Sequence, residues 1–142
     1  MVGVLVMAGA FSLTSPAFTD GGNIPSKYTC DAGRENPSPA LAWKDAPAGA
    51  KSFVLIMHDP DAPMAGGFTH WVLFDIPAAT NSLPENFQAN SIGVSGNSGF
   101  RRLGYGGPCP PSGEHRYVFT LKALDERGRV VGQGQLLGKY RK

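Results

Sequence analysis

Three apolar runs constrain the fold of this chain more than any other feature of its sequence. The runs Ser52–His58, His70–Ile76 and Arg116–Leu124 are seven to nine residues long and rich in β-branched and aromatic side chains. Runs of this length, bounded by Gly and Pro, are typical of strands. The first two are apolar at both sets of alternating positions, which predicts central strands covered on both faces in a protein of two packed layers.

The rest of the sequence also favours a β protein. Gly and Pro account for 19 and 12 of the 142 residues, so their combined share is nearly double the usual roughly 12%. No segment has the sustained 3.6-residue apolar period of an amphipathic helix. Shorter strands are expected at Phe11–Thr14, Leu41–Trp43 and Gln135–Tyr140. Because no repeat or linker divides the chain, residues 1–142 are expected to form a single all-β domain with few or no helices.

Charge, targeting and cysteine patterns exclude several classes of protein. The net charge of +2 is too small to indicate a nucleic-acid partner. No transmembrane segment is expected, because the apolar N-terminal stretch Val2–Ala10 is too short to cross a membrane. A truncated export signal and an N-terminal strand both fit this stretch.

The two cysteines leave the redox state and the compartment open. Cys30 and Cys109 are not part of a C-x-x-C pair, so they are either free thiols or the two halves of one long-range disulfide. A cytoplasmic location is expected. A periplasmic or secreted location is the alternative, if the N-terminus is a truncated signal or the cysteines are bridged.

Three loops beside the expected strands concentrate the polar side chains that could carry chemistry. These loops are His58–Pro63, Gly66–Trp71 and Gly104–Tyr117. Their candidate residues are Asp59, Asp61, His70, His115, Arg116 and Tyr117. An isolated pair of acids caps a turn and a lone histidine is most often structural, but two histidines at loop-to-strand junctions indicate a ligand site. Imidazole and hydroxyl groups, with backbone N–H groups beside glycines, suit an oxyanion.

Other kinds of chemistry have less support. The sequence contains no G-x-S-x-G nucleophile elbow and no phosphate-binding G-x-x-x-x-G-K-[ST] loop. A metal-dependent hydrolase is a weaker alternative because its ligands have no standard metal-site spacing. A metal site could use Asp59, Asp61, His70 and His115, and the hydrolase would be built on the first three.

Taken together, these loops and several further segments resemble the phosphatidylethanolamine-binding protein family, also called the Raf kinase inhibitor protein family, in its bacterial and archaeal YbhB/YbcL-like branch. The resemblance covers nearly the whole chain. The matching segments, in chain order, are Leu13–Phe18, Ile24–Asp31, Asn36–Trp43, Asp59–Pro63, Thr69–Val72 and Gly104–Pro108 followed by His115–Phe119.

The resemblance implies a two-layer antiparallel β-sandwich with Greek-key character and a small anion-binding cavity. The cavity residues that it implies are Asp59, His70, His115 and Tyr117, with Pro108 at the rim. Asp61 and Arg116 match the same motifs and are expected to support the loops. Phe68 stands where many relatives have a Trp, so we expect a smaller aromatic wall.

The function that the resemblance implies is non-enzymatic binding of a small anion such as phosphate or a phosphorylated head group, without a cofactor. The alternative is inhibition of a serine protease or a kinase through surface loops. Because an unperturbed histidine has a pKa of about 6.5, the two histidines are expected to bind anions more tightly at about pH 6 than at about pH 8.

The C-terminal region departs from the family pattern. After Leu124 and Asp125 the family carries a further segment with a helix, followed by a closing strand. Here residues 125–130 run almost directly into residues 131–133, so a helical segment is expected to be lacking between Val130 and Val131.

Overall fold

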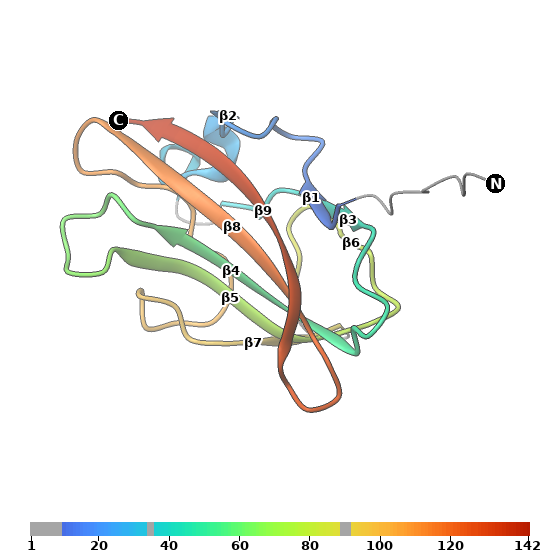
Figure 1. The fold of residues 1–142 in the computed structure, drawn as a ribbon. Coiled ribbons are helices and arrows are strands. Elements are labelled where there is room, and N and C mark those ends of the chain that lie inside the picture. Colours follow the sequence, from blue (N-terminus) through green and yellow to red (C-terminus); the bar gives the residue numbers. More distant parts are fainter. Residues whose placement is uncertain (1–9, 34–35, 89–91) are drawn as a thin grey trace.

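The larger of two sheets contains the three strands that the sequence predicts most clearly. The structure, a computed structural model, describes residues 10–33, 36–88 and 92–142. In it β4 (Ser52–Asp59) lies between β5 (Phe68–Pro77) and β8 (Glu114–Leu124), antiparallel to both. The sheet continues with β9 (Val130–Arg141) beside β8 and β7 (Val94–Ser95) beside β5. Figure 1 shows these long strands running side by side across the molecule.

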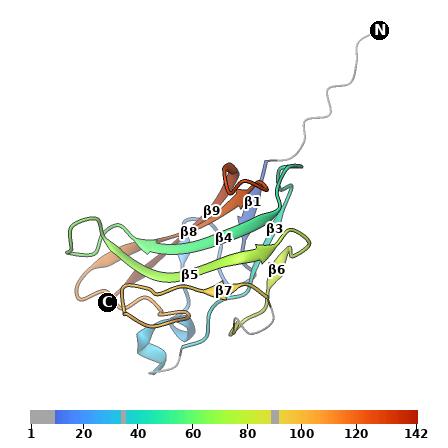
Figure 2. The same ribbon diagram turned by 90° about the horizontal axis from the view of Figure 1, so that it is seen from below.

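The smaller sheet packs on one side of the larger one. It consists of β1 (Ser12–Thr14), β3 (Leu41–Lys44) and β6 (Ser82–Leu83), all antiparallel, in the order β1-β3-β6. Figures 1 and 2 both show it near the end of the larger sheet where β4 begins. The expected two-layer β-sandwich is therefore confirmed.

Two short elements complete the fold. The strand β2 (Gly22–Asn23) runs parallel to β9 at the edge of the larger sheet, and it is the exception to the antiparallel pairing. The helices in the described residues are two single 3₁₀ turns, η1 (Ser26–Tyr28) and η2 (Cys30–Ala32). Neither turn is long and apolar enough to cross a membrane.

The core lies between the two sheets. Along β4 the residues that face it are fully buried, and the ring of Phe53 packs 5.7 Å from that of Trp43 in the smaller sheet. The alternate residues, such as Val54 and Ile56, are only half-buried. The expectation that β4 and β5 are covered on both faces was therefore wrong for the face turned away from the smaller sheet, where Val72 and Phe74 of β5 are also only half-buried. Among the described residues, no third sheet or long helix covers that face.

A tight hairpin joins the two longest strands. The turn between β8 and β9 is closed by Asp125, whose Oδ1 accepts hydrogen bonds from the backbone N–H groups of Arg127 and Arg129 at 2.9 Å each. Val130 and Val131 are consecutive residues of β9. The sequence comparison with the family placed a missing helical segment at this point, and in this chain a direct β-hairpin stands there.

The two cysteines form a disulfide. Cys30 at the start of η2 is bonded to Cys109 in the loop before β8, with 5.4 Å between their Cα atoms. Of the two states that the sequence left open, the structure has the bridged one. The other open question, whether Val2–Ala10 is a signal or a strand, concerns residues 1–9, which lie outside the described residues.

Candidate functional site

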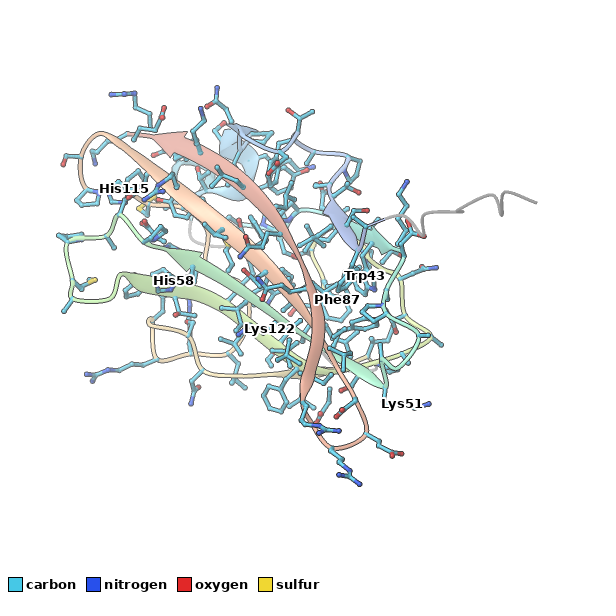
Figure 3. All side chains as sticks on the ribbon, in the orientation of Figure 1. Trp43, Lys51, His58, Phe87, His115 and Lys122 are labelled. Atoms are coloured by element: carbon cyan, nitrogen blue, oxygen red, sulfur yellow. A yellow bond between two sulfur atoms is a disulfide. The ribbon has the colours of Figure 1, made fainter. Side chains whose placement is uncertain are left out.

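A cavity of about 190 Å³ opens at the end of the larger sheet where β4 finishes and β5 and β8 begin. Because β4 is antiparallel to both neighbours, its last residue meets the first residues of theirs, and loops far apart in sequence converge at this edge. The residues that line the cavity are Asp59, Ala62, Pro63, Met64, Phe68, His70, Phe100, Cys109, Pro111 and His115. Figure 3 shows His115 at this end of the sheet, opposite Lys51 at the start of β4.

An aspartate and a histidine form a buried pair in the cavity wall. The ring Nδ1 of His115 donates a hydrogen bond to Oδ2 of Asp59 at 2.7 Å, and the two residues are 7% and 3% exposed. The other carboxylate oxygen, Oδ1, accepts from the backbone N–H of Asp61 at 2.8 Å. Asp59 therefore fixes both the orientation of the His115 ring and the position of its Nδ1 proton.

The second histidine of the cavity is held by a backbone carbonyl. Nδ1 of His70 donates to the Gly106 carbonyl oxygen at 2.8 Å, and the residue is 5% exposed. The rings of Phe68 and Phe100 pack edge-on against it, each with 5.2 Å between centroids. Burial lowers the pKa of His70 below its ordinary value of 6.5, although the Gly106 carbonyl and Asp59 act in the opposite direction.

Tyr117 links the two histidines through its ring. It is completely buried and does not line the cavity. Its ring centroid lies 5.2 Å from that of His70 and 6.4 Å from that of His115. No hydrogen bond of ordinary geometry to its hydroxyl is found among the described residues. Burial first and the Asp59 carboxylate second raise its pKa, and the nearby Cys109 backbone partly opposes them. The predicted grouping of these residues is therefore present, with the tyrosine packed beside the histidines rather than in the wall of the cavity.

Asp61 and Arg116 brace the loop after β4. Arg116 donates from Nη2 to Oδ1 of Asp61 at 2.8 Å and from Nε to Oδ2 at 2.9 Å, and its backbone N–H also donates to Oδ2. This paired contact lowers the pKa of Asp61 to about 2. Both residues lie outside the cavity lining.

The structure places Pro108 away from the cavity lining. It is buried, and its carbonyl oxygen accepts a hydrogen bond from the backbone N–H of Cys30 at 3.1 Å. The neighbouring Cys109 lines the cavity instead, together with Pro111. The rim that the family resemblance assigned to Pro108 is thus formed by the residues that follow it, and the disulfide anchors them.

Several wall residues were not anticipated from the sequence. Phe100 is 38% exposed and its ring lies 4.8 Å from that of Phe68, so two phenylalanines form the smaller aromatic wall. Met64 is 54% exposed at the cavity mouth. Neither residue lies in a motif or in a predicted strand. Only their apolar character within Gly-rich loops could have indicated a role in the wall.

A larger hollow, of about 350 Å³, lies elsewhere on the surface. Its lining is mainly amide and hydroxyl groups, including those of Asn36, Ser38 and Asn86, with Arg102 as its charged side chain. It contains no buried pair of titratable groups among its lining residues. The smaller cavity is therefore the better candidate for specific chemistry.

The donor set of the smaller cavity does not form a metal site. Within residues 10–33, 36–88 and 92–142, no three His, Cys, Asp or Glu side chains are placed to share a metal ion. Asp61, one of the four candidate metal ligands, is instead paired with Arg116 outside the cavity lining.

Comparison with known proteins identifies the family of this chain. The model of the phosphatidylethanolamine-binding protein family matches residues 14–139. The chain belongs to this family. A UPF0098 protein from Methanothermobacter thermautotrophicus is 44% identical, over 92% of this chain and 99% of its own length. The UPF0098 protein YbhB from Escherichia coli is 41% identical, over 86% of this chain and 83% of its own.

Solved structures of family members have the same fold. A homologue of phosphatidylethanolamine-binding protein from Chlamydia trachomatis superposes with a TM-score of 0.84 at 34% identity, over 94% of this chain and 98% of the other. The E. coli family member YbcL superposes with a TM-score of 0.86 at 27% identity, over 94% of this chain and 99% of the other. The fold expected from the sequence is therefore confirmed.

Proposed function

We propose that this chain binds a small oxyanion, phosphate or a phosphorylated head group, in the cavity at His70 and His115 and catalyses no reaction on it. The observation that carries this proposal is the buried His115–Asp59 pair, 2.7 Å apart, beside a second buried histidine. A protonated imidazole held by a carboxylate offers a charge-assisted hydrogen bond to an anion. The family is named for the binding of a phospholipid, which supports a phosphorylated ligand.

The size and lining of the cavity support a head group rather than a whole lipid. Its volume of about 190 Å³ is below the roughly 300–1,000 Å³ typical of pockets for larger organic ligands. The walls away from the histidines are apolar, formed by Met64, Phe68 and Phe100 among others. Such walls exclude water and strengthen the hydrogen bonds made inside.

Binding without turnover is proposed because the lining offers no activated nucleophile. Among the lining residues the sulfur of Cys109 is tied up in the disulfide, and no Ser, Thr or Lys is present. The histidine bonded to a carboxylate lacks the third partner that a catalytic triad requires. We therefore propose that the site binds its ligand and releases it unchanged.

The test is isothermal titration calorimetry with inorganic phosphate and phosphoethanolamine. Both are expected to bind, and more tightly at about pH 6 than at about pH 8, because a protonated ring adds a donor and a positive charge. The variant His115→Ala should lose at least about tenfold in affinity, corresponding to ~1.4 kcal/mol. Lys122→Ala, which removes a positive charge from β8 outside the cavity, is the control and should bind normally. Failure of the wild type to bind either ligand would refute the proposal.

The same preparation distinguishes a small-molecule binder from an inhibitor. A protein whose function resides in the cavity should leave a chymotrypsin-like protease fully active at any ratio of the two proteins. Stoichiometric loss of protease activity that persists in His115→Ala would show that surface loops carry the function instead.

We also propose that the chain functions in an oxidising compartment, the periplasm or the exterior of the cell. The Cys30–Cys109 disulfide supports this location, because such bonds are kept reduced in most cytosols. Fractionation of the producing cells, followed by alkylation of free thiols, tests it. Unbridged protein recovered from the cytosol would contradict it.

A further inference from the structure

The position of the proton on His70 determines which ligands this ring can accept. Its Nδ1 lies 2.8 Å from the carbonyl oxygen of Gly106, which can only accept a hydrogen bond. Nδ1 must therefore carry the proton of the neutral ring, and Nε2 is left with a lone pair and no hydrogen. A neutral His70 offers the cavity an acceptor and no donor.

The surroundings of His70 keep its ring neutral. The groups that face it are Asp59 from β4, Tyr117 from β8 and the Gly106 and Gly107 backbone, with His58 of β4 further away. Asp59 and the backbone carbonyls favour the protonated ring and His58 opposes it, but burial among the phenylalanine rings outweighs them and lowers the pKa of His70. The second nitrogen therefore remains an acceptor at neutral pH.

Nε2 of both histidines is accessible from the cavity. The fully enclosed side-chain N and O atoms without a partner, among the described residues, are Ser12 Oγ, Trp43 Nε1 and Tyr117 Oη. Neither imidazole Nε2 belongs to this set, and no hydrogen bond from either to the described protein is found. Since both residues line the cavity, these two nitrogens are side-chain polar atoms that a ligand can meet there.

The two rings differ in what holds Nδ1. His115 has a carboxylate at Nδ1, so a protonated ring would have a charged partner on one side and a donor at Nε2 on the other. His70 faces a neutral carbonyl and is packed among aromatic rings, so that its Nε2 accepts. The ligand that fits both rings therefore accepts a hydrogen bond from His115 at one oxygen and donates a hydrogen bond to His70 from another.

We propose that the cavity selects oxyanions that bring a proton of their own, with His70 Nε2 accepting a hydrogen bond from the P–OH group of hydrogen phosphate or of a singly ionised phosphate monoester. This selectivity rests on the anion binding proposed above. Sulfate has the same tetrahedral shape but no proton near neutral pH, so one of its oxygens would face the lone pair of His70. Both the sulfate oxygen and Nε2 of His70 would give up hydrogen bonds with water, and neither could donate a new hydrogen bond to the other.

The test compares phosphate with sulfate by calorimetry at pH 7 and constant ionic strength. Inorganic phosphate should bind at least about tenfold more tightly than sulfate, corresponding to ~1.4 kcal/mol. In His70→Gln the side-chain amide can present either a donor or an acceptor, so the preference should fall to within about threefold while phosphate still binds. Lys122→Ala is the control and should keep the wild-type ratio.

The outcomes separate this selectivity from the proposed function. If the wild type binds neither ion, anion binding itself fails, and the selectivity with it. If the wild type binds sulfate as tightly as phosphate, anion binding stands and the selectivity is refuted. An unchanged ratio in a folded His70→Gln, as judged by circular dichroism, would refute the role of His70 even where the wild type discriminates.

Discussion

Loss of the Cys30–Cys109 disulfide should remove a large part of the stability of this protein. The bridge joins residues 79 positions apart, so in the unfolded chain it closes a long loop. The chain-entropy relation for a loop of this length gives about 4.5 kcal/mol at 25 °C. Because domains of this kind have total stabilities of roughly 5–15 kcal/mol, the double variant Cys30→Ser/Cys109→Ser should remain folded but only with a narrow margin.

Urea denaturation of the wild type and the double variant measures this loss. The free energy of unfolding should fall by roughly 3–5 kcal/mol. Wild type treated with dithiothreitol should match the untreated double variant, and dithiothreitol should have no effect on the double variant itself. A loss below about 1 kcal/mol would refute the reasoning, because it would mean that the bridge hardly restricts the unfolded chain.

The same variant should also bind phosphate less tightly. Cys109 lines the cavity, and Pro108 beside it accepts a hydrogen bond from the backbone of Cys30. The loop that includes them also contains Gly106, whose carbonyl holds His70. Without the bridge this loop has fewer anchors, and a several-fold weaker affinity is expected by calorimetry. An unchanged affinity would show that the hydrogen bonds position the loop on their own.

Three further predictions concern the loops, the titration of His70 and the core. Gly67→Ala should lower the free energy of unfolding, measured in urea, more than Gly66→Ala does. Both glycines have φ near +80°, a conformation that costs a residue with a side chain about 1–2 kcal/mol. Only at Gly67 would the new Cβ also lie 2.4 Å from the backbone oxygen of Asp59. Equal losses would contradict this. Because the pKa of His70 is lower in the folded protein than its ordinary 6.5, the unfolded state binds more protons, so stability should decrease as pH falls below about 6.5. In His70→Gln this part of the pH dependence should be absent from the unfolding free energies. Leu121→Ala, at a completely buried position of β8, should destabilise by roughly 2–5 kcal/mol in the same assay, and a loss below 1 kcal/mol would be inconsistent with a packed core.

The long strands could be predicted because each contains a run of seven or more residues rich in β-branched and aromatic side chains. In β4 and β8 every second residue is buried, but in β4 the alternate residues are apolar too, so the sequence alone does not show which set is buried. The two-residue strands β2 and β7 are too short to contain such a run. Their place in the sheet depends on partners far along the chain, β9 and β5.

The candidate site was predictable in its residue types and only partly in its geometry. Asp59, His70 and His115 could be expected together because the family resemblance implies it, and the structure gives the reason, since they stand at the ends of strands that share one edge. The position of Pro108 and the participation of Phe100 depend on how two Gly-rich loops pack, and loop packing leaves no periodic trace in a sequence. The pairing of the cysteines was open for the same reason, because spacing alone does not determine distance in space.

The pH dependence expected from a pair of ordinary histidines now has a more specific origin. From the sequence alone His70 and His115 are equivalent, because each stands where a Gly-rich loop meets a predicted strand. The structure gives them different partners for Nδ1: a buried carbonyl for His70 and a carboxylate for His115. Since burial lowers the pKa of His70, protonation of this ring contributes less to a gain in anion affinity between about pH 8 and pH 6, and the proton of the ligand becomes a second source. Phosphate gains a proton in this range and sulfate does not. A rise in affinity for both ions would therefore assign the effect to the protein, and a rise for phosphate alone would assign it to the additional proton that phosphate gains.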